Sequence, residues 1–325
     1  MLALRLALGV AVLVLVLRYA GVTPVMRALR RADPALLLLG ASLLPPIVLL
    51  RTVRWSLLLR AQGVALPWRL LLRALLLGVL VGQLLPTEIA GDATRAVATR
   101  RAGAATRTAV GAVLADRLLG IWALLAAAAL GLLLGGSAAR LGLPPWSWAV
   151  PAAMVVLSVP AIAALGRAPL LRTGGSDGLL RRWAAAIAET VHAFASRRGT
   201  LAASAAIAVL GKALIAVQIA WLAASLGTDV GVLDMLALAP LVSPAIALPV
   251  SVGGIGLREA SWAFAFARYG YPAATGVAFA WLLYGTLLLE GLAGGLLALL
   301  SSGQRSDAAR AAPGELEPGE LRSAP

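Results

Sequence analysis

Residues 109–134 read AVGAVLADRLLGIWALLAAAALGLLL, a run of mainly Ala and Leu that is interrupted by two charges, Asp116 and Arg117. About 20 mostly apolar residues in a helix are enough to cross the hydrocarbon core of a bilayer. The Leu and Ala content and the lack of strict two-residue alternation favour a helix over a strand. This stretch therefore predicts a transmembrane helix that carries charges inside the membrane.

The rest of the chain repeats this pattern. Its 325 residues are 61% hydrophobic and 13% charged, with a mean hydropathy of +0.91, whereas a soluble domain is about a quarter charged. Only helices and closed barrels satisfy their backbone in lipid, so we expect an all-α, polytopic transmembrane helix bundle over residues 1–300. The polar residues 301–325 predict a disordered C-terminal tail. We expect about eight spans, near residues 2–17, 35–50, 70–85, 109–134, 146–165, 201–226, 232–252 and 275–300.

Charge and composition also exclude several classes of protein. The net charge is +14, but the basic residues are spread between apolar runs, which is typical of helix ends that meet lipid headgroups rather than of nucleic-acid binding. There is no cysteine, the single histidine is His192, and the Gly211-Lys212 pair lacks the rest of a nucleotide-binding loop. We therefore expect no metal, no cofactor and no nucleic-acid partner.

Membrane sidedness poses a difficulty. The basic segments 51–73 and 166–199 both predict a cytoplasmic location, yet three expected spans lie between them. A segment after Pro86 that re-enters the membrane from the same side would resolve the conflict.

Two polar segments match each other in sequence. Residues 85–95 read LPTEIAGDATR and residues 248–258 read LPVSVGGIGLR. Both fit Leu-Pro, four residues, Gly, three residues, Arg, and both follow an apolar run. Proline ends a helix and glycine permits a tight reversal, so we predict broken or re-entrant segments around 86–100 and 249–262. The residues expected to break the helices are Pro86, Gly91, Pro249, Gly253, Gly254 and Gly256. Paired interruptions in two halves of a chain point to a transporter binding site, and ordinary loops are the alternative.

The charges in and near these segments predict a phosphate site. A helix that begins near the glycine offers free N–H groups, and an arginine adds a fork of donors. We therefore assign lipid phosphate binding to Arg95, Arg117 and Arg258, with Asp92 and Glu259 holding the arginines in place. The supporting polar residues are Glu88, Asp92, Asp116, Glu259, Lys212 and Glu290. Lys212 and Glu290 are expected to pair. The alternative is that all of these charges form structural ion pairs.

At these residues the chain resembles the transmembrane region of lysylphosphatidylglycerol synthase and its stand-alone, flippase-like relatives. The resemblance covers about residues 50–300 and rests on Arg54-Trp55 with Leu57 and Leu58, on 85–96, on Asp116-Arg117-Leu118-Leu119-Gly120 and on 248–259. One departure is Thr87-Glu88-Ile89-Ala90, where relatives carry a Gly-rich pair before the aspartate. The full-length synthase also has an aminoacyl-transfer domain, which these residues do not contain. The resemblance therefore implies lipid translocation without aminoacylation.

Together these observations predict a multi-pass protein of the bacterial cytoplasmic membrane. We expect it to translocate or bind an anionic phospholipid or a polyprenyl-phosphate-linked lipid without ATP hydrolysis. The alternative is a membrane enzyme or accessory subunit that acts on polyprenyl-phosphate-linked sugars. A structural partner for another membrane enzyme is a third interpretation.

Overall fold

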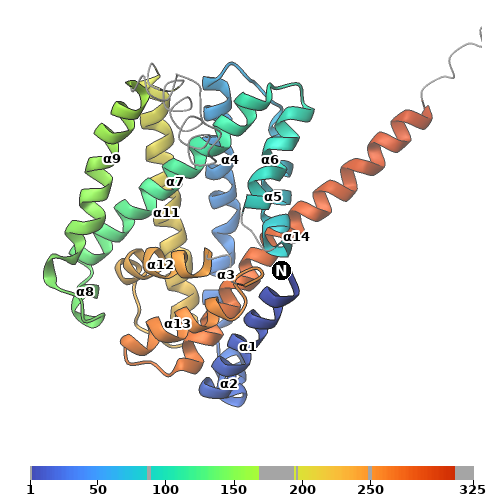
Figure 1. The fold of residues 1–325 in the computed structure, drawn as a ribbon. Helices are drawn as coiled ribbons and strands as arrows, with labels where there is room; N and C mark the ends of the chain where they lie inside the picture. The colour runs from blue at the N-terminus through green and yellow to red at the C-terminus, as the bar shows by residue number, and fades with distance from the viewer. Residues whose placement is uncertain (1, 86–88, 168–193, 195–196, 248–250, 312–325) are drawn as a thin grey trace, which may run out of the picture.

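A computed structural model of the chain describes residues 2–85, 89–167, 194, 197–247 and 251–311, and these contain helices and no strand. The all-α fold class is therefore confirmed. Figure 1 shows the helices as an elongated bundle. In chain order they are α1 (Leu2–Ala20), α2 (Val22–Arg30), α3 (Pro34–Ser42), α4 (Leu44–Ala61), α5 (Trp68–Leu84), α6 (Ile89–Arg101), α7 (Thr106–Leu134), α8 (Ser137–Arg140), the 3-10 helix η1 (Pro145–Trp148), α9 (Ala149–Arg167), α11 (Arg198–Ser225), α12 (Val232–Ala247), α13 (Leu257–Arg268) and α14 (Ala273–Ala311).

Within the described residues, four helical segments are long and apolar enough to cross a membrane, namely 34–61 (α3 with α4), 106–134, 198–225 and 273–298. A fifth exists if α1 and α2, which are bent by 78°, count as one span. The membrane class is confirmed, but the count of long spans is smaller than the predicted eight. Helix α5 has 17 residues and α12 has 16, with Pro240 and Pro244 inside it. Both are shorter than the 18 residues required of a helix that is counted as a membrane span.

Helices α5 and α6 form a hairpin in which their backbones touch. A Cβ atom on Gly91 would lie 2.4 Å from the carbonyl oxygen of Gly78, so any side chain there would push the helices apart. Gly91 lies in the first turn of α6, which begins at Ile89, so a new helix does start near this glycine. Its lack of a side chain serves close packing. Pro86 and Glu88 lie outside the described residues.

This hairpin changes the path of the chain between the two basic segments. Helix α6 returns towards the end of the bundle where α5 begins, and among the described residues α7 and α9 are the helices that cross the bundle between α4 and α11 (Figure 1). The C-terminus of α4 and the N-terminus of α11 therefore lie at one end of the bundle. We call it the arginine-rich end, after the exposed side chains of Arg60, Arg69, Arg100, Arg101, Arg107 and Arg198.

The second predicted break is also present in the backbone. Between α12 and α13, Gly253, Gly254 and Gly256 have φ angles of 60°, 75° and 82°, a region that favours glycine. Pro249 lies outside the described residues. At the C-terminus, α14 continues to Ala311, so the chain is helical in the first part of the segment predicted as a disordered tail. The remainder, 312–325, is outside the described residues.

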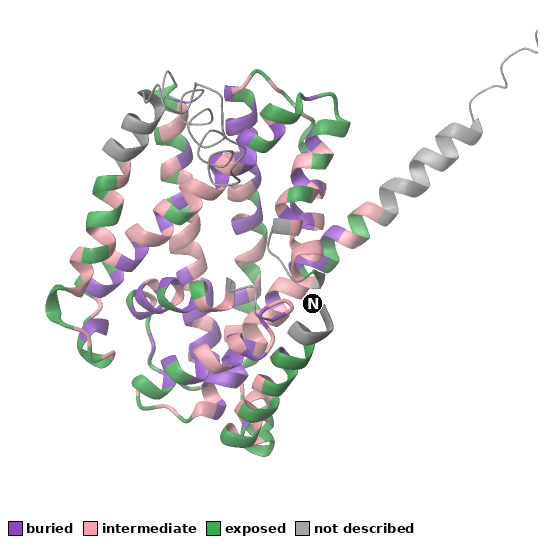
Figure 2. Cartoon of the chain, viewed as in Figure 1, coloured by how far each residue is buried: buried purple, intermediate pink, exposed green. Residues whose placement is uncertain are grey.

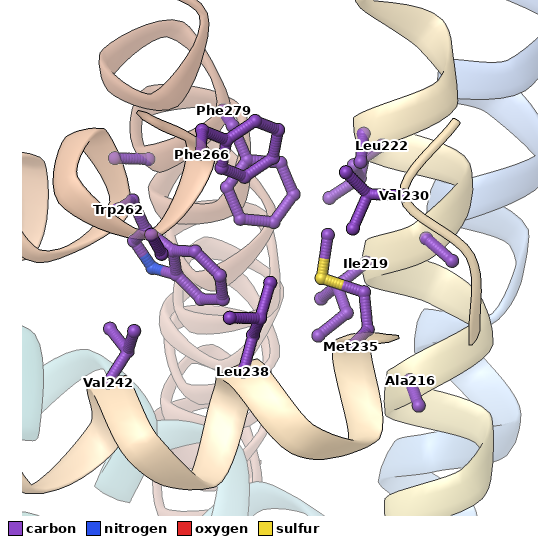
Figure 3. Packing of buried hydrophobic residues seen from close by; sticks show 14 residues of the cluster. Ala216, Ile219, Leu222, Val230, Met235, Leu238, Val242, Trp262, Phe266 and Phe279 are labelled. Atoms are coloured by element: carbon purple, nitrogen blue, oxygen red, sulfur yellow. The ribbon is translucent and has the colours of Figure 1, made fainter. Parts of the chain in front are cut away.

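Packing separates the interior of the bundle from a lipid-facing surface. Trp262, Phe266 and Phe279 form the centre of the largest core cluster, with ring centroids of Trp262 and Phe279 4.6 Å apart (Figure 3). This cluster joins α11, α12, α13 and α14. On the outside, large apolar side chains such as Leu38 and Val156 are about two-thirds exposed, at 71% and 67%, and exposed residues follow the outer helix faces (Figure 2). Exposed apolar surface of this extent fits contact with lipid.

Candidate functional site

Three helices bring five charged side chains together in the interior. Arg54 of α4 donates through Nε to Oδ1 of Asp116 at 2.6 Å, and Arg95 of α6 donates through Nη1 to Oδ2 of Asp116 at 2.9 Å. Arg95 also donates through Nη2 to Oδ1 of Asp92 at 2.7 Å, and Arg117 donates through Nε to Oδ2 of Asp92. Arginines and aspartates thus alternate from α4 across to α7. We call Arg54, Asp116, Arg95, Asp92 and Arg117 the arginine–aspartate network.

Helix geometry explains this order. Asp92 and Arg95 are three residues apart in α6 and share a face. Asp116 and Arg117 are neighbours in α7 and point in different directions, so each must find a partner on another helix. Asp116 meets Arg54 and Arg95, whereas Arg117 turns to Asp92.

Burial differs along the network. The side chains of Arg95 and Asp116 are only 10% and 9% exposed, and that of Arg54 is 12% exposed. Arg117 is 38% exposed. Buried ions are tolerated where partners and hydrogen bonds satisfy them, which is the case for every carboxylate oxygen of Asp92 and Asp116. The network therefore has a buried centre and reaches the accessible surface at Arg117.

The central arginine is also held by its surroundings. The guanidinium of Arg95 lies over the ring of the fully buried Trp55, 5.3 Å from the ring centroid, a cation–π contact that strengthens when water is excluded. One turn later, the hydroxyl of Thr99 donates to the carbonyl of Arg95 at 2.9 Å. Arg95 is therefore fixed in place before any ligand arrives.

A second ion pair lies close to the network. Arg51 of α4 donates to the carboxylate of Glu290 of α14 at 2.5 Å, and Arg51 is one helical turn from Arg54. Glu290 is buried. The predicted pairing of Lys212 with Glu290 is therefore replaced by Arg51 with Glu290. The reason is rotation of the helices, since Lys212 of α11 lies on the side that faces α7 and α12.

Lys212 instead lines a cavity of about 80 Å³ between those three helices. The walls are mainly apolar, with Ile215, Met235 and Pro240 among them, and Ser243 adds a hydroxyl. The Ser243 hydroxyl donates to the backbone carbonyl of Ala239 at 2.6 Å. Among the described contacts, Lys212 is not joined to the arginine–aspartate network.

Arg258 and Glu259 shape the second break. Arg258 donates through Nη2 to the carbonyl of Gly253 at 2.7 Å, and its guanidinium lies 4.3 Å from the ring centroid of Tyr284. Glu259 accepts the N–H of Gly256 at 2.7 Å and so caps α13. Among the described contacts, the carboxylate of Glu259 thus serves the start of its own helix, and the expectation that it holds an arginine stays a prediction.

The two matched segments nevertheless lie next to each other. A Cβ atom on Gly253 would be 3.0 Å from the carbonyl oxygen of Gln83, which is in the last turn of α5 just before the first break. Among the described contacts, Arg95 and Arg117 share the network and Arg258 is not joined to it. The structure thus brings the two breaks together. Of the three arginines predicted to bind phosphate, however, the described contacts join only Arg95 and Arg117 in one network.

Two important residues were missed by sequence reasoning. Arg51 and Arg54 lie in the continuation of an apolar helix, where an arginine also fits a helix end that meets headgroups. Their spacing of three residues was the available signal, because it places both on one face with Trp55 beside them. Only the packing of α4 against α7 and α14 assigns their partners.

The fold and these contacts define a polytopic α-helical membrane protein with an ionic network held inside its bundle. The model of the family "Lysylphosphatidylglycerol synthase TM region" matches residues 2–294. The chain therefore belongs to this family, as its motifs predicted. A search of curated proteins finds no match.

Proposed function

We propose that this protein binds the phosphate of an anionic lipid at the arginine–aspartate network and carries that lipid across the membrane without ATP hydrolysis. One observation supports the proposal above all others. Three arginines converge on two aspartates between α4, α6 and α7, and the side chain of Arg117 is 38% exposed at the edge of this buried cluster.

The cost of placing these groups in a membrane argues for a role beyond packing. A charged residue at the centre of a bilayer costs about 2.5–3.5 kcal/mol on insertion scales, and such residues commonly mark substrate pathways. Arginine is suited to phosphate because its planar fork donates two parallel hydrogen bonds. The aspartates hold Arg95 and Arg117 in fixed orientations, which lowers the entropy that a headgroup must lose on binding.

The hairpin of α5 and α6 supplies a second argument. Near the start of α6, the side chains of Asp92 and Arg95 are only 19% and 10% exposed, so they lie largely within the protein interior. Irregular backbone at membrane depth is tolerated when it is buried in protein or lines a wet cavity. Broken helices of this kind surround the substrate in many transporters.

The substrate is a phosphate-bearing amphiphile, either a phospholipid or a polyprenyl-phosphate-linked lipid. The excess of arginine at one end of the bundle supports a cytoplasmic location for that end in a bacterial cell, by the positive-inside tendency. The proposal assigns no enzymatic step to the chain. An accessory role beside an enzyme that acts on polyprenyl-phosphate-linked sugars is the alternative.

Reconstitution separates these alternatives. The purified full chain is placed in liposomes that contain either headgroup-labelled phosphatidylglycerol or a labelled polyprenyl phosphate, and a membrane-impermeant quencher reports exchange between leaflets. We expect faster exchange of at least one of these lipids than in protein-free liposomes, with no nucleotide added. Unchanged exchange of both would overturn the proposal. Consumption of a lipid-linked sugar by the same preparation would favour the enzymatic alternative.

A further inference from the structure

Two arginines from distant parts of the sequence meet at the end of the bundle opposite the arginine-rich end. Arg140 ends α8 and Arg268 ends α13. Arg268 donates through Nη2 to the carbonyl of Leu141 at 2.7 Å, the residue directly after Arg140. A Cβ atom on Gly142 would lie 2.4 Å from the same nitrogen, so the guanidinium fits there because residue 142 has no side chain. We call this site the Arg140–Arg268 corner.

Arg140 is also held in place. Its guanidinium lies 5.1 Å from the ring centroid of Tyr269, and its side chain is 46% exposed. The nearest acid is Asp234, whose Oδ2 is 3.8 Å from Nη1 of Arg140. That distance is too long for a hydrogen bond. The contact with Asp234 therefore orients Arg140 without using its donors.

Asp234 is satisfied by other groups. Its Oδ1 accepts the hydroxyls of Ser137 at 2.9 Å and of Tyr269 at 3.0 Å, and its Oδ2 accepts the N–H of Gly231 at 3.1 Å. A carboxylate with three such donors gains little by drawing Arg140 closer. Among the described hydrogen bonds, none uses a guanidinium donor of Arg140, whose side chain is 46% exposed.

The corner lies where a lipid headgroup would be found. It joins the turn after α7 to the end of α13, at the end of the bundle opposite the start of α7 (Figure 1). Beside it, Trp146 of η1 is 63% exposed and Leu134 of α7 is 61% exposed. Exposed tryptophan next to arginine is typical of the zone where headgroups meet acyl chains.

We propose that the Arg140–Arg268 corner is an anion site for the phosphate of a lipid headgroup at this membrane surface. Arginine suits phosphate because its fork donates parallel hydrogen bonds, and here Arg140 is oriented by Tyr269 and Arg268 by the Leu141 carbonyl. The site is distinct from the arginine–aspartate network, and its occupancy does not depend on transport. A soluble phosphate has the same chemistry, so the experiment must separate the two sources.

Binding to the detergent-purified full chain tests this proposal. Native mass spectrometry counts short-chain phosphatidylglycerol molecules bound to the wild type, to Arg140→Gln, to Arg268→Gln and to the double variant. Arg140→Lys keeps the charge but loses the fork, and Arg69→Gln removes an exposed arginine at the opposite end as a control. All variants are repeated in an Arg117→Gln background, in which binding at the network is weakened.

We expect the double variant to bind phosphatidylglycerol about tenfold more weakly or worse, since two charge-assisted contacts are lost. Arg69→Gln should bind as the wild type does. The loss should persist in the Arg117→Gln background, which keeps this result separate from the fate of the proposed transport function. Competition by inorganic phosphate would identify a site open to soluble anions, and failure to compete would identify a lipid headgroup site. Equal binding by the double variant, or equal binding of phosphatidylglycerol and phosphatidylcholine by the wild type, would overturn the proposal.

Discussion

Replacing Asp116 by Asn should destabilise the protein strongly, because this carboxylate neutralises two buried arginines at once. Its oxygens accept Arg54 at 2.6 Å and Arg95 at 2.9 Å, and the residue is 6% exposed. Removing one partner of a buried ion pair typically costs about 3–5 kcal/mol, since the remaining charge is left uncompensated. Asp116→Asn keeps the shape of the side chain and one acceptor, so we expect a loss of about 3 kcal/mol in the free energy of unfolding.

The assay is reversible unfolding in mixed micelles, with helix content followed as a denaturing detergent is added. Asp229→Asn is the matched control, because Asp229 is exposed and bonds to the hydroxyl of Tyr271; it should cost about 1 kcal/mol or less. A cycle with Arg54→Gln measures the coupling directly. The double variant should be more stable than the sum of the two single losses by about 0.5–3 kcal/mol. If Asp116→Asn costs no more than Asp229→Asn, the network does not hold α4, α6 and α7 together as described.

Three further predictions concern other parts of the chain. Because the sequence contains no cysteine, single cysteines introduced at Ala105 and Ala139 report the membrane topology without background labelling. In intact cells, an impermeant maleimide should label Ala139→Cys but not Ala105→Cys. The reverse labelling pattern would mean the opposite orientation. Gly91→Ala should lower the free energy of unfolding by about 1–3 kcal/mol through overpacking against Gly78. The control Gly285→Ala, whose Cβ atom meets nothing within 4 Å, should be tolerated. Equal losses of stability in the two variants would contradict the close contact of α5 and α6. Burial and the neighbouring Asp234 raise the pKa of Tyr269 to about 12. The stabilisation from its protonated hydroxyl should therefore be complete below the ordinary pKa of about 10 and be lost as the pH rises towards 12. Tyr269→Phe should remove that part of the alkaline decline in melting temperature, and an unchanged pH profile in this variant would refute the prediction.

Sequence reasoning succeeded where local chemistry decides the structure. The apolar run 109–134 with Asp116 and Arg117 forms α7, and the glycines at 253–256 adopt positive φ angles. The sequence also predicted one group of charges that included Arg258, Glu259, Lys212 and Glu290, and four of its members, Asp92, Arg95, Asp116 and Arg117, share the network. These features depend on hydrophobic length, on glycine and on residue spacing along one helix.

It failed where the partner of a residue depends on how helices rotate and pack. Lys212 and Glu290 both lie inside apolar helices, yet Glu290 meets Arg51 and Lys212 faces a cavity beside α7 and α12. Likewise, 70–85 has the length of a short span, and only its contact with α6 shows a hairpin. Tertiary contacts between helices carry this information, and a single sequence does not contain it in readable form.

Leaflet exchange by variants of the network tests the central claim most directly. Arg95→Gln, Arg117→Gln and their combination are reconstituted beside the wild type and beside Arg69→Gln, an exposed arginine outside the network. The lipid used is the one that the wild type translocates fastest. We predict that exchange falls at least about tenfold in the combined variant, as expected when charge-assisted phosphate contacts are lost, and that Arg69→Gln exchanges lipid at the wild-type rate. Wild-type exchange by a folded Arg95→Gln, Arg117→Gln protein would contradict the assignment of this network as the site of lipid transport.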